Sequence, residues 1–371
     1  MSLRRLLKAA TTDCKPAQTK TRAARWLPIG VLGALAWLPM TSQAGTSFSY
    51  QDWQVACDNT LTCRIAGYQS EKNSDMPVSV LLTRRAGKGA LTTGKLKLGG
   101  TKDSSAKALM KLGNRHRITM RINGKDLGET RPVSNESGDS ELTRAQVDAL
   151  VEALGTSSTI EFVFRNSRWQ LSDKGATAVM LKADDVQGRV GTSGALVNPN
   201  AAAGNQGVLD PRAAPILNKV LPNEKNDARK FRIRASQLAS IVKGATKNAA
   251  DTCPSLNDDS AWRISRLNDS QLLVQHSCWL AAYNAGTGMW VMNDSKPYKP
   301  TLVTTDATDY HAGVIRAEQK GRGIGDCYSI DEWVWTGARF EKSREATTGM
   351  CRLIEAGGAW QMPTFVTDIK G

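Results

Sequence analysis

The pattern of apolar and polar positions along the chain predicts a protein built mainly from short strands. Residues 50–55, 117–122 and 160–164 alternate between apolar and polar side chains, which is typical of strands with one buried face. Asn123-Gly124 directly follows the second run and supplies the positive φ angles of a tight hairpin turn. This segment is therefore the clearest predicted hairpin of the chain.

Helical periodicity is confined to a few segments. Thr143 and Gln146 have the spacing of a capping box, and Gly155 follows the last apolar position of the helix that they introduce. The apolar stripe of this helix consists of Val147, Leu150, Val151 and Leu154. A second short helix is expected over residues 174–186, with Ser172 as its cap.

The composition changes after residue 197. Residues 198–227 hold four prolines among alanines, glycines and asparagines, and we interpret them as a linker. A short helix is expected over residues 236–243. From Cys253 onward, short apolar segments alternate with turn residues, including those at 284–288 and 336–337, which predicts an antiparallel sheet.

These patterns together predict a mainly β protein with a few short helices and two domains. Residues 45–197 form the predicted N-terminal β-rich domain, residues 198–227 the Pro/Ala-rich linker, and residues 228–371 the C-terminal β domain. Six of the eight tryptophans that follow residue 44 lie in the C-terminal domain.

Residues 1–44 have the composition of a secretory signal peptide rather than of a folded element. A basic leader precedes an apolar run at 26–40, and Ser42-Gln43-Ala44 offers small residues for cleavage near Ala44. A membrane anchor is the alternative, but the run is short for a spanning helix and contains two prolines. The sequence therefore predicts a periplasmic protein without a membrane span after cleavage.

Removal of this segment lowers the formal net charge from +14 to +8, because it carries seven cations and one acid. The remaining positive charge favours anionic partners, such as outer-leaflet phosphates or acidic glycans. It is spread along the chain, and no arginine stripe with interleaved aromatic residues is present. Nucleic acid is therefore not an expected partner.

Six cysteines follow residue 44, and an even number of cysteines in an exported protein indicates disulfides. Fifteen pairings of six cysteines are possible. Sequence locality favours Cys57–Cys63, Cys253–Cys278 and Cys327–Cys351. A zinc site is the alternative, but the spacings contain no paired C-x2-C, and no metal is expected.

The segment at 320–327 is the most chemically specialised part of the chain, with three glycines, two cations, a carboxylate and a cysteine. Its spacing and exported context do not fit a nucleotide-binding loop. Backbone N–H groups of such a loop, together with Lys320 and Arg322, could bind an anion, and Asp326 could organise the loop through backbone hydrogen bonds. Alternatively, the glycines only permit a tight turn that a disulfide holds.

Trp333 and Trp335 are candidates for stacking on sugar rings. They share one face of a predicted strand, which is also what core packing requires. Catalysis has little basis in the sequence, because the chain has only three histidines (His116, His276 and His311) and no G-x-S-x-G or H-E-x-x-H motif. No cofactor is expected.

Several motifs resemble a known family. They are Tyr50-x-x-Trp53-x-Val55-x-Cys57 followed by Cys63, the glycine-rich run at 187–196, Cys278-Trp279-x-x-Ala282-Tyr283-Asn284, and the run at 320–327. Together they are similar to the secreted proteobacterial family catalogued as domain of unknown function 1176. The first motif also resembles the invasion-associated locus B proteins, which implies a periplasmic, β-sandwich-like N-terminal domain. The resemblance supplies no catalytic residues.

The expected function is therefore that of a non-enzymatic, disulfide-stabilised protein that binds a ligand or a component of the cell envelope. Its partner would be an envelope glycan, an anionic ligand or a periplasmic protein. One alternative is a glycan- or peptidoglycan-directed hydrolase with Asp326 or Asp331 as acid or base. The other is an inhibitor that inserts the 320–327 loop into the cleft of a periplasmic enzyme.

Overall fold

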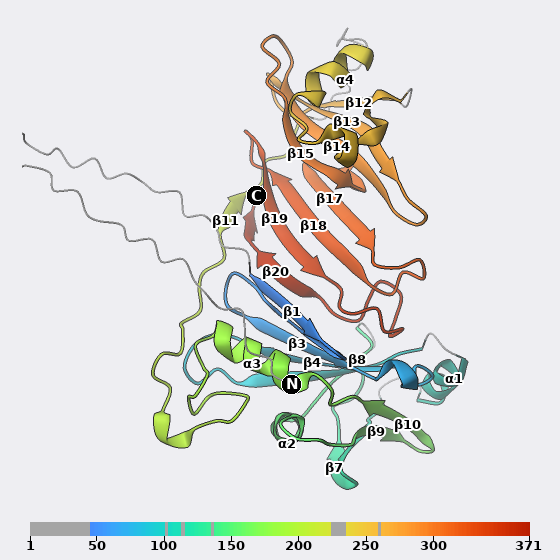
Figure 1. The fold of residues 1–371 in the computed structure, drawn as a ribbon, viewed down its shortest axis with the longest axis vertical. Helices are drawn as coiled ribbons and strands as arrows, with labels where there is room; N and C mark the ends of the chain where they lie inside the picture. The colour runs from blue at the N-terminus through green and yellow to red at the C-terminus, as the bar shows by residue number, and fades with distance from the viewer. Residues whose placement is uncertain (1–44, 101–102, 113–115, 135–136, 224–234, 259–260) are drawn as a thin grey trace, which may run out of the picture. The chain divides into compact units, whose positions relative to one another are not determined.

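The computed structural model describes residues 45–100, 103–112, 116–134, 137–223, 235–258 and 261–371. The expected signal peptide, its cleavage site near Ala44 and the last four residues of the expected linker lie outside these residues. Within them, 21 strands form five sheets, and the predicted mainly β fold class is confirmed (Figure 1).

The N-terminal half contains two antiparallel sheets. The six-stranded sheet has the order β1-β2-β3-β4-β5-β8, and the four-stranded sheet has the order β10-β9-β6-β7. The strands of the first sheet are β1 (Thr46–Tyr50), β2 (Trp53–Cys57), β3 (Cys63–Tyr68), β4 (Val78–Arg84), β5 (Thr92–Leu98) and β8 (Asp139–Glu141). Those of the second are β6 (Thr119–Ile122), β7 (Lys125–Glu129), β9 (Ile160–Phe164) and β10 (Ser167–Leu171).

The C-terminal half contains a four-stranded and a five-stranded antiparallel sheet, and a short parallel pair of β11 (Ile216–Asn218) and β21 (Asp368–Lys370). The four-stranded sheet consists of β12 (Arg263–Arg266), β13 (Gln271–Leu280), β14 (Ala285–Asn293) and β15 (Thr301–Ala307). The five-stranded sheet consists of β16 (Asp309–His311), β17 (Val314–Lys320), β18 (Tyr328–Trp335), β19 (Phe340–Thr347) and β20 (Met362–Val366).

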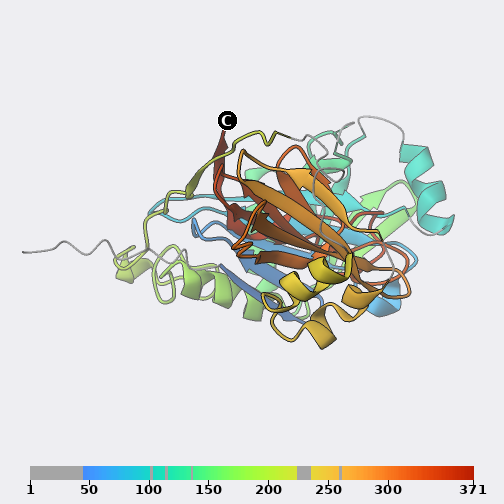
Figure 2. The same ribbon diagram turned by 90° about the horizontal axis from the view of Figure 1, so that it is seen from above.

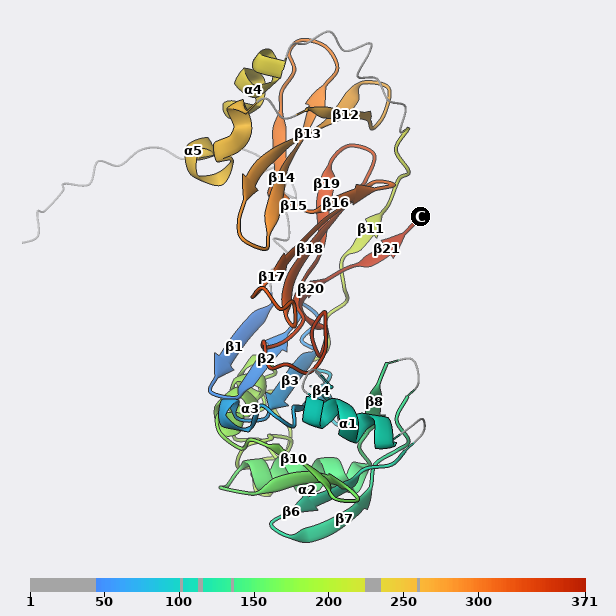
Figure 3. The same ribbon diagram turned by 90° about the vertical axis from the view of Figure 1, so that its right-hand side faces the viewer.

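The helices are short and cover faces of these sheets. The α-helices of the described residues are α1 (Asp103–Leu112), α2 (Arg144–Leu154), α3 (Ala176–Val186), α4 (Ala235–Lys243) and α5 (Ala249–Thr252). The 3-10 turns are η1 (Glu71–Asn73), η2 (Ala201–Ala203) and η3 (Pro254–Asn257). Helix α3 lies against β1, β2 and β3 (Figure 3). Helix α4, in yellow, packs on the orange strands of the four-stranded sheet that begins with β12 (Figure 2).

Local sequence signals explain the elements that were predicted best. Asn123 and Gly124 have φ angles of 50° and 79°, and they join β6 to β7 in the expected hairpin. Thr143 accepts a hydrogen bond from the Gln146 N–H at 3.3 Å, and the Gln146 side chain accepts one from the Thr143 N–H at 2.9 Å. Both the hairpin and the capping box are confirmed.

Two local predictions are wrong. Helix α3 begins after Gly175, which has a φ of 95° and no side chain, so Ser172 does not cap it. The second error concerns residues 284–288, where a turn was expected, because Gly286 and Gly288 lie within β14. A Cβ atom at Gly286 would overlap the indole of Trp279 on the neighbouring strand β13, and one at Gly288 would overlap the indole of Trp290 on β14 itself, so these glycines make room for tryptophans.

The apolar side chains form several clusters. The largest combines both N-terminal sheets with α2 and α3, and its buried members include Trp53, Phe162 and Trp169. A smaller cluster joins β2 and β3 to the C-terminal chain around Tyr68 and Trp360. The Nε1 atom of Trp360 also donates a hydrogen bond to the Ser79 hydroxyl at 2.7 Å, which adds a polar contact to this cluster.

Three disulfides pair the six cysteines as Cys57–Cys63, Cys253–Cys278 and Cys327–Cys351, the pairs that sequence locality favours. The first joins the facing ends of β2 and β3. Disulfides of this kind are typical of proteins in oxidising compartments. In the described part of the chain, no helix has the length and apolar character needed to cross a membrane.

Candidate functional site

The glycine-rich loop of residues 321–327 connects β17 to β18 and is closed at its base. The Gly321 N–H donates to the Cys327 carbonyl at 2.9 Å, and Cys327 is disulfide-bonded to Cys351. Gly325, with a φ of 70°, accepts a hydrogen bond from the Gly357 N–H at 2.8 Å. These contacts hold the loop from both sides.

Arg322 and Asp326 form an ion pair inside this loop. The Arg322 Nε donates to Asp326 Oδ1 at 2.7 Å, and its Nη2 donates to Oδ2 at 2.5 Å. The Leu353 N–H also donates to Oδ2, at 2.7 Å. Burial alone would raise the pKa of Asp326, but the hydrogen bonds from Arg322 and Leu353 outweigh it and lower that pKa. Asp326 therefore organises the loop, and it occupies the guanidinium fork that an external anion would need.

The ion pair predicts a stability that depends on pH. Asp326→Asn is expected to lower the free energy of unfolding by about 1–3 kcal/mol at pH 7, because the buried side chain loses its charge-assisted bonds. A lowered folded-state pKa adds stability above the unfolded pKa of about 3.9, and this stability is lost as the pH falls through the folded value. Urea unfolding at pH 7 and at pH 2.5 measures the difference.

The exposed Asp309→Asn variant is the control for this experiment and should match the wild type at both pH values. Arg322→Ala should cost less than Asp326→Asn, because the Arg322 side chain is 41% exposed and solvent screens its charge. An equal deficit of Asp326→Asn at both pH values would show that the ion pair does not stabilise the loop.

Lys320 is the last residue of β17, and its backbone binds a second sequence motif. The Asn284 side chain accepts a hydrogen bond from the Lys320 N–H at 2.8 Å and donates to the Lys320 carbonyl at 2.9 Å. The motif that ends at Asn284 and the glycine-rich loop are thus neighbours. Tyr283 lies over Gly323, where an added Cβ would be 3.5 Å from its ring.

Trp333 and Trp335, the candidates for stacking on sugar rings, have different surroundings. Trp335 is fully buried in the C-terminal core, with its ring 5.2 Å from that of Phe340. Trp333 is half-buried, and the Lys342 ammonium lies 5.8 Å from its ring centre. Of the two, Trp333 alone has surface that a sugar could contact. Asp331, which the hydrolase alternative names, is paired with Lys342 at 2.8 Å.

Asp326 also lies close to the sulfurs of Cys327 and Cys351, with the three potential ligand atoms within 4.8 Å of one another. Both sulfurs belong to the disulfide, and metals bind the thiolate form of cysteine. This group therefore fits a structural role in the oxidised protein.

Sequence reasoning missed a larger site in the N-terminal half. A pocket of about 700 Å³ lies between the β4–β5 hairpin, α2 and the segment that follows α3. Arg84 and Arg189 line it, although the two residues are only 2% and 1% exposed. Arg189 belongs to the glycine-rich run at 187–196. In the sequence this run indicates only the resemblance to a family and no binding role.

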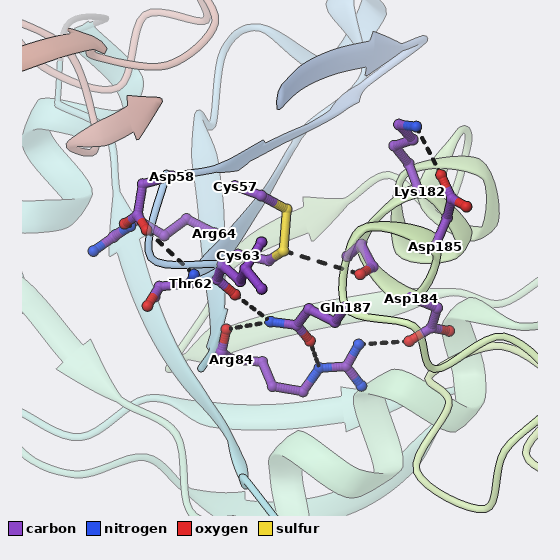
Figure 4. Close-up of a disulfide and its surroundings, with 12 residues drawn as sticks. Cys57, Asp58, Thr62, Cys63, Arg64, Arg84, Lys182, Asp184, Asp185 and Gln187 are labelled. Atoms are coloured by element: carbon purple, nitrogen blue, oxygen red, sulfur yellow. Dashed lines mark hydrogen bonds and ion pairs between the residues drawn. A yellow bond between two sulfur atoms is a disulfide. The ribbon is translucent and has the colours of Figure 1, made fainter. Parts of the chain in front are cut away.

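Arg84 lies at the end of β4 and is held by a buried carboxylate. Its Nη2 donates to Asp184 Oδ1 at 2.5 Å, its Nε to Gln187 Oε1 at 2.9 Å, and its Nη1 to the Gly194 carbonyl at 3.0 Å. Figure 4 shows the contacts of Arg84 with Asp184 and Gln187 beside the Cys57–Cys63 disulfide. All three nitrogens of the Arg84 guanidinium thus have partners within the chain.

Both carboxylate oxygens of Asp184 are engaged within the chain. Its Oδ2 atom accepts hydrogen bonds from the N–H groups of Leu196 at 2.8 Å and Val197 at 3.0 Å. Asp184 is fully buried, and these bonds fix the segment that forms one wall of the pocket.

Arg189 has only neutral partners. Its Nε donates to Gln187 Oε1 at 3.1 Å and its Nη2 to the Gly87 carbonyl at 2.6 Å. Within the residues that the structure describes, no carboxylate lies in ion-pair contact with Arg189, and its Nη1 makes no hydrogen bond. Burial and the charge of Arg84 lower the pKa of Arg189 to about 10, and the charge of Asp184 offsets only part of this effect.

The buried cluster therefore contains two guanidinium groups and one carboxylate. One positive charge remains uncompensated, and an uncompensated buried charge costs several kcal/mol. The uncompensated group lines a pocket large enough for a small molecule. This arrangement is chemically suited to bind an anion, and Arg189 is the residue that would contact it.

Comparison with known protein families relates the chain to one whose function is unknown. The model of the family described as "Protein of unknown function (DUF1176)" matches residues 47–367. Comparison with curated proteins and with solved structures gives no significant match.

Proposed function

We propose that this chain, which belongs to the DUF1176 family of proteins of unknown function, is a non-enzymatic binding protein for a small anionic molecule. The main support for this proposal is the guanidinium group of Arg189, which lines the 700 Å³ pocket and has no compensating charge. An anion bound there would neutralise a charge that the fold itself leaves without a partner. We assign anion binding to this pocket and not to the 320–327 loop, because Arg322 of that loop is already paired with Asp326.

We also propose that the protein acts in the periplasm, where small anionic molecules that pass the outer membrane are accessible to it. Three disulfides support an oxidising compartment, and the composition of residues 1–44 supports export. A glycan hydrolase has a weaker basis, because Asp326 and Asp331 are both engaged in ion pairs.

A second function, inhibition of a periplasmic enzyme, is favoured by one observation. The 321–327 loop is braced by a disulfide and an ion pair, and it presents Ile324 with 62% of its surface exposed. A rigid loop with an exposed apolar tip loses little conformational entropy when it enters a cleft. Replacement of Ile324 by aspartate would abolish such an interaction and leave the arginine pocket unchanged.

Binding of simple anions tests the main proposal. Acetate, succinate and phosphate are titrated into the disulfide-bonded protein by calorimetry at constant ionic strength. At least one of these anions is expected to bind. The Arg189→Met variant is expected to lower the affinity for that anion at least tenfold, because it removes the uncompensated charge.

Arg168→Met, at an exposed arginine of β10 outside the pocket, is the matched control and should bind like the wild type. Equal affinity of the Arg189→Met variant and the wild type would overturn the proposal, as would the absence of binding by all three anions.

A further inference from the structure

The wall of the pocket that α2 provides has the opposite charge. Arg144, Asp148 and Glu152 of α2 line the pocket, and Arg144 pairs with Asp148 at 2.8 Å. Glu152 is exposed, and its carboxylate makes no ion pair with any cation in the described parts of the chain. This wall therefore carries one negative charge that its neighbours do not neutralise.

The end of α2 adds to this negative potential. Gly155 and Thr156 follow the last turn of the helix and line the pocket. The carbonyl groups at a helix C-terminus carry a partial negative charge, which favours a nearby cation. Glu152 lies in this last turn, so the side chain and the backbone act in the same direction.

Apolar side chains and neutral amides complete the lining of the pocket. Leu91, with 65% of its surface exposed, Val151 and Leu196 line the pocket, as do the polar side chains of Asn198 and Asn205. Apolar side chains with a few amides suit a short polypeptide, whose backbone needs hydrogen bonds and whose side chains need apolar contact.

The charges also exclude other anions. A dicarboxylate, a nucleotide or a polyphosphate would place negative charge near Glu152 and the C-terminal end of α2, where like charges repel. A molecule with one carboxylate and one ammonium group satisfies both ends. A single free amino acid would leave much of a 700 Å³ pocket unfilled, since that volume lies within the range typical of drug-sized ligands.

We propose that the pocket binds a short zwitterionic peptide, with its C-terminal carboxylate on Arg189 and its N-terminal ammonium group on Glu152. This inference rests on the proposed anion-binding function and adds the class of ligand to it. In this arrangement the side chains of the peptide contact Leu91 and Val151, which line the same pocket.

Blocked peptides test the two ends separately. The tripeptide Ala-Leu-Ala is titrated into the disulfide-bonded protein with free ends, with an acetylated N-terminus, with an amidated C-terminus, and with both ends blocked. The free peptide should bind best. Acetylation should weaken binding about two- to fivefold, as loss of one exposed charge pair predicts, and amidation should weaken it more.

Glu152→Gln should lower the affinity for the free peptide by the same factor as acetylation of the peptide does. It should not change the affinity for the acetylated peptide. Glu129→Gln, at an exposed glutamate of β7 outside the pocket, is the matched control. Such non-additivity identifies Glu152 as the contact of the ammonium group.

The outcomes separate this inference from the function on which it rests. Equal binding of the free and acetylated peptides would overturn the zwitterionic ligand and leave the anion site intact. Binding of succinate without binding of any peptide would do the same. Equal binding of the free and amidated peptides would overturn the contact between the peptide carboxylate and Arg189. The proposed function itself would fail only if, in addition, Arg189→Met bound simple anions as the wild type does or no simple anion bound.

Discussion

Asp184→Ala is expected to lower the free energy of unfolding by about 3–5 kcal/mol, the cost of removing one partner from a buried ion pair. Asp184 is fully buried and is the only carboxylate in contact with the Arg84 guanidinium among the described residues. Without it, two buried cations remain with no compensating charge. The N–H groups of Leu196 and Val197 also lose their acceptor.

Urea unfolding followed by tryptophan fluorescence measures this loss. The neighbouring Asp185→Ala is the matched control, because Asp185 is exposed and pairs with Lys182 on the surface of α3. It should change stability by less than about 0.5 kcal/mol. A difference of less than 1 kcal/mol between the two variants would show that the cluster tolerates its charges without Asp184.

A compensating variant tests the physical cause. Arg84→Met combined with Asp184→Leu removes both partners, and it should recover a large part of the stability that Asp184→Ala loses, because no unpaired charge of this pair stays behind. If the double variant were as unstable as Asp184→Ala, packing around Asp184, rather than its charge, would explain the loss.

Features that depend on neighbouring residues could be predicted from the sequence. Asn123-Gly124 determines its hairpin because both residues tolerate positive φ angles, and Thr143 and Gln146 cap α2 across three residues. The disulfides followed the same rule, since none of the pairs spans more than 25 positions.

The arginine pocket could not be predicted in this way. Arg84 and Asp184 are 100 residues apart, and their contact exists only because α3 packs on the first sheet. In the sequence, Arg84 precedes a second arginine and Asp184 precedes a second aspartate, a pattern that is typical of solvated surface charges. Local signals do not distinguish a buried charge from an exposed one.

The glycine-rich loop shows the reverse problem. Its cations suggested an anion site, yet Arg322 and Asp326, only four residues apart, pair with each other. Gly286 and Gly288 were interpreted as turn residues because glycine permits positive φ angles. Their actual role is to leave space for Trp279 and Trp290, which a single sequence does not reveal.

Arg189→Met is expected to weaken anion binding at least tenfold and to leave the free energy of unfolding unchanged within about 1 kcal/mol, or to raise it. Methionine fills a similar volume, and it removes a buried charge whose desolvation no carboxylate offsets. Two hydrogen bonds, to Gly87 and Gln187, are lost in exchange. Arg84→Met should instead cost about 3–5 kcal/mol, since it leaves Asp184 buried without a cation.

The pH dependence of this difference identifies its cause. The pKa of Arg189 is lowered to about 10 in the folded protein, so above that pH the unfolded chain binds more protons than the folded chain. Wild-type stability should therefore rise relative to that of Arg189→Met as the pH passes 10. Urea unfolding of both proteins at pH 9 and pH 11, without added anions, measures the change. A constant difference, or a loss of several kcal/mol at pH 9, would show that Arg189 stabilises the fold and does not serve a ligand.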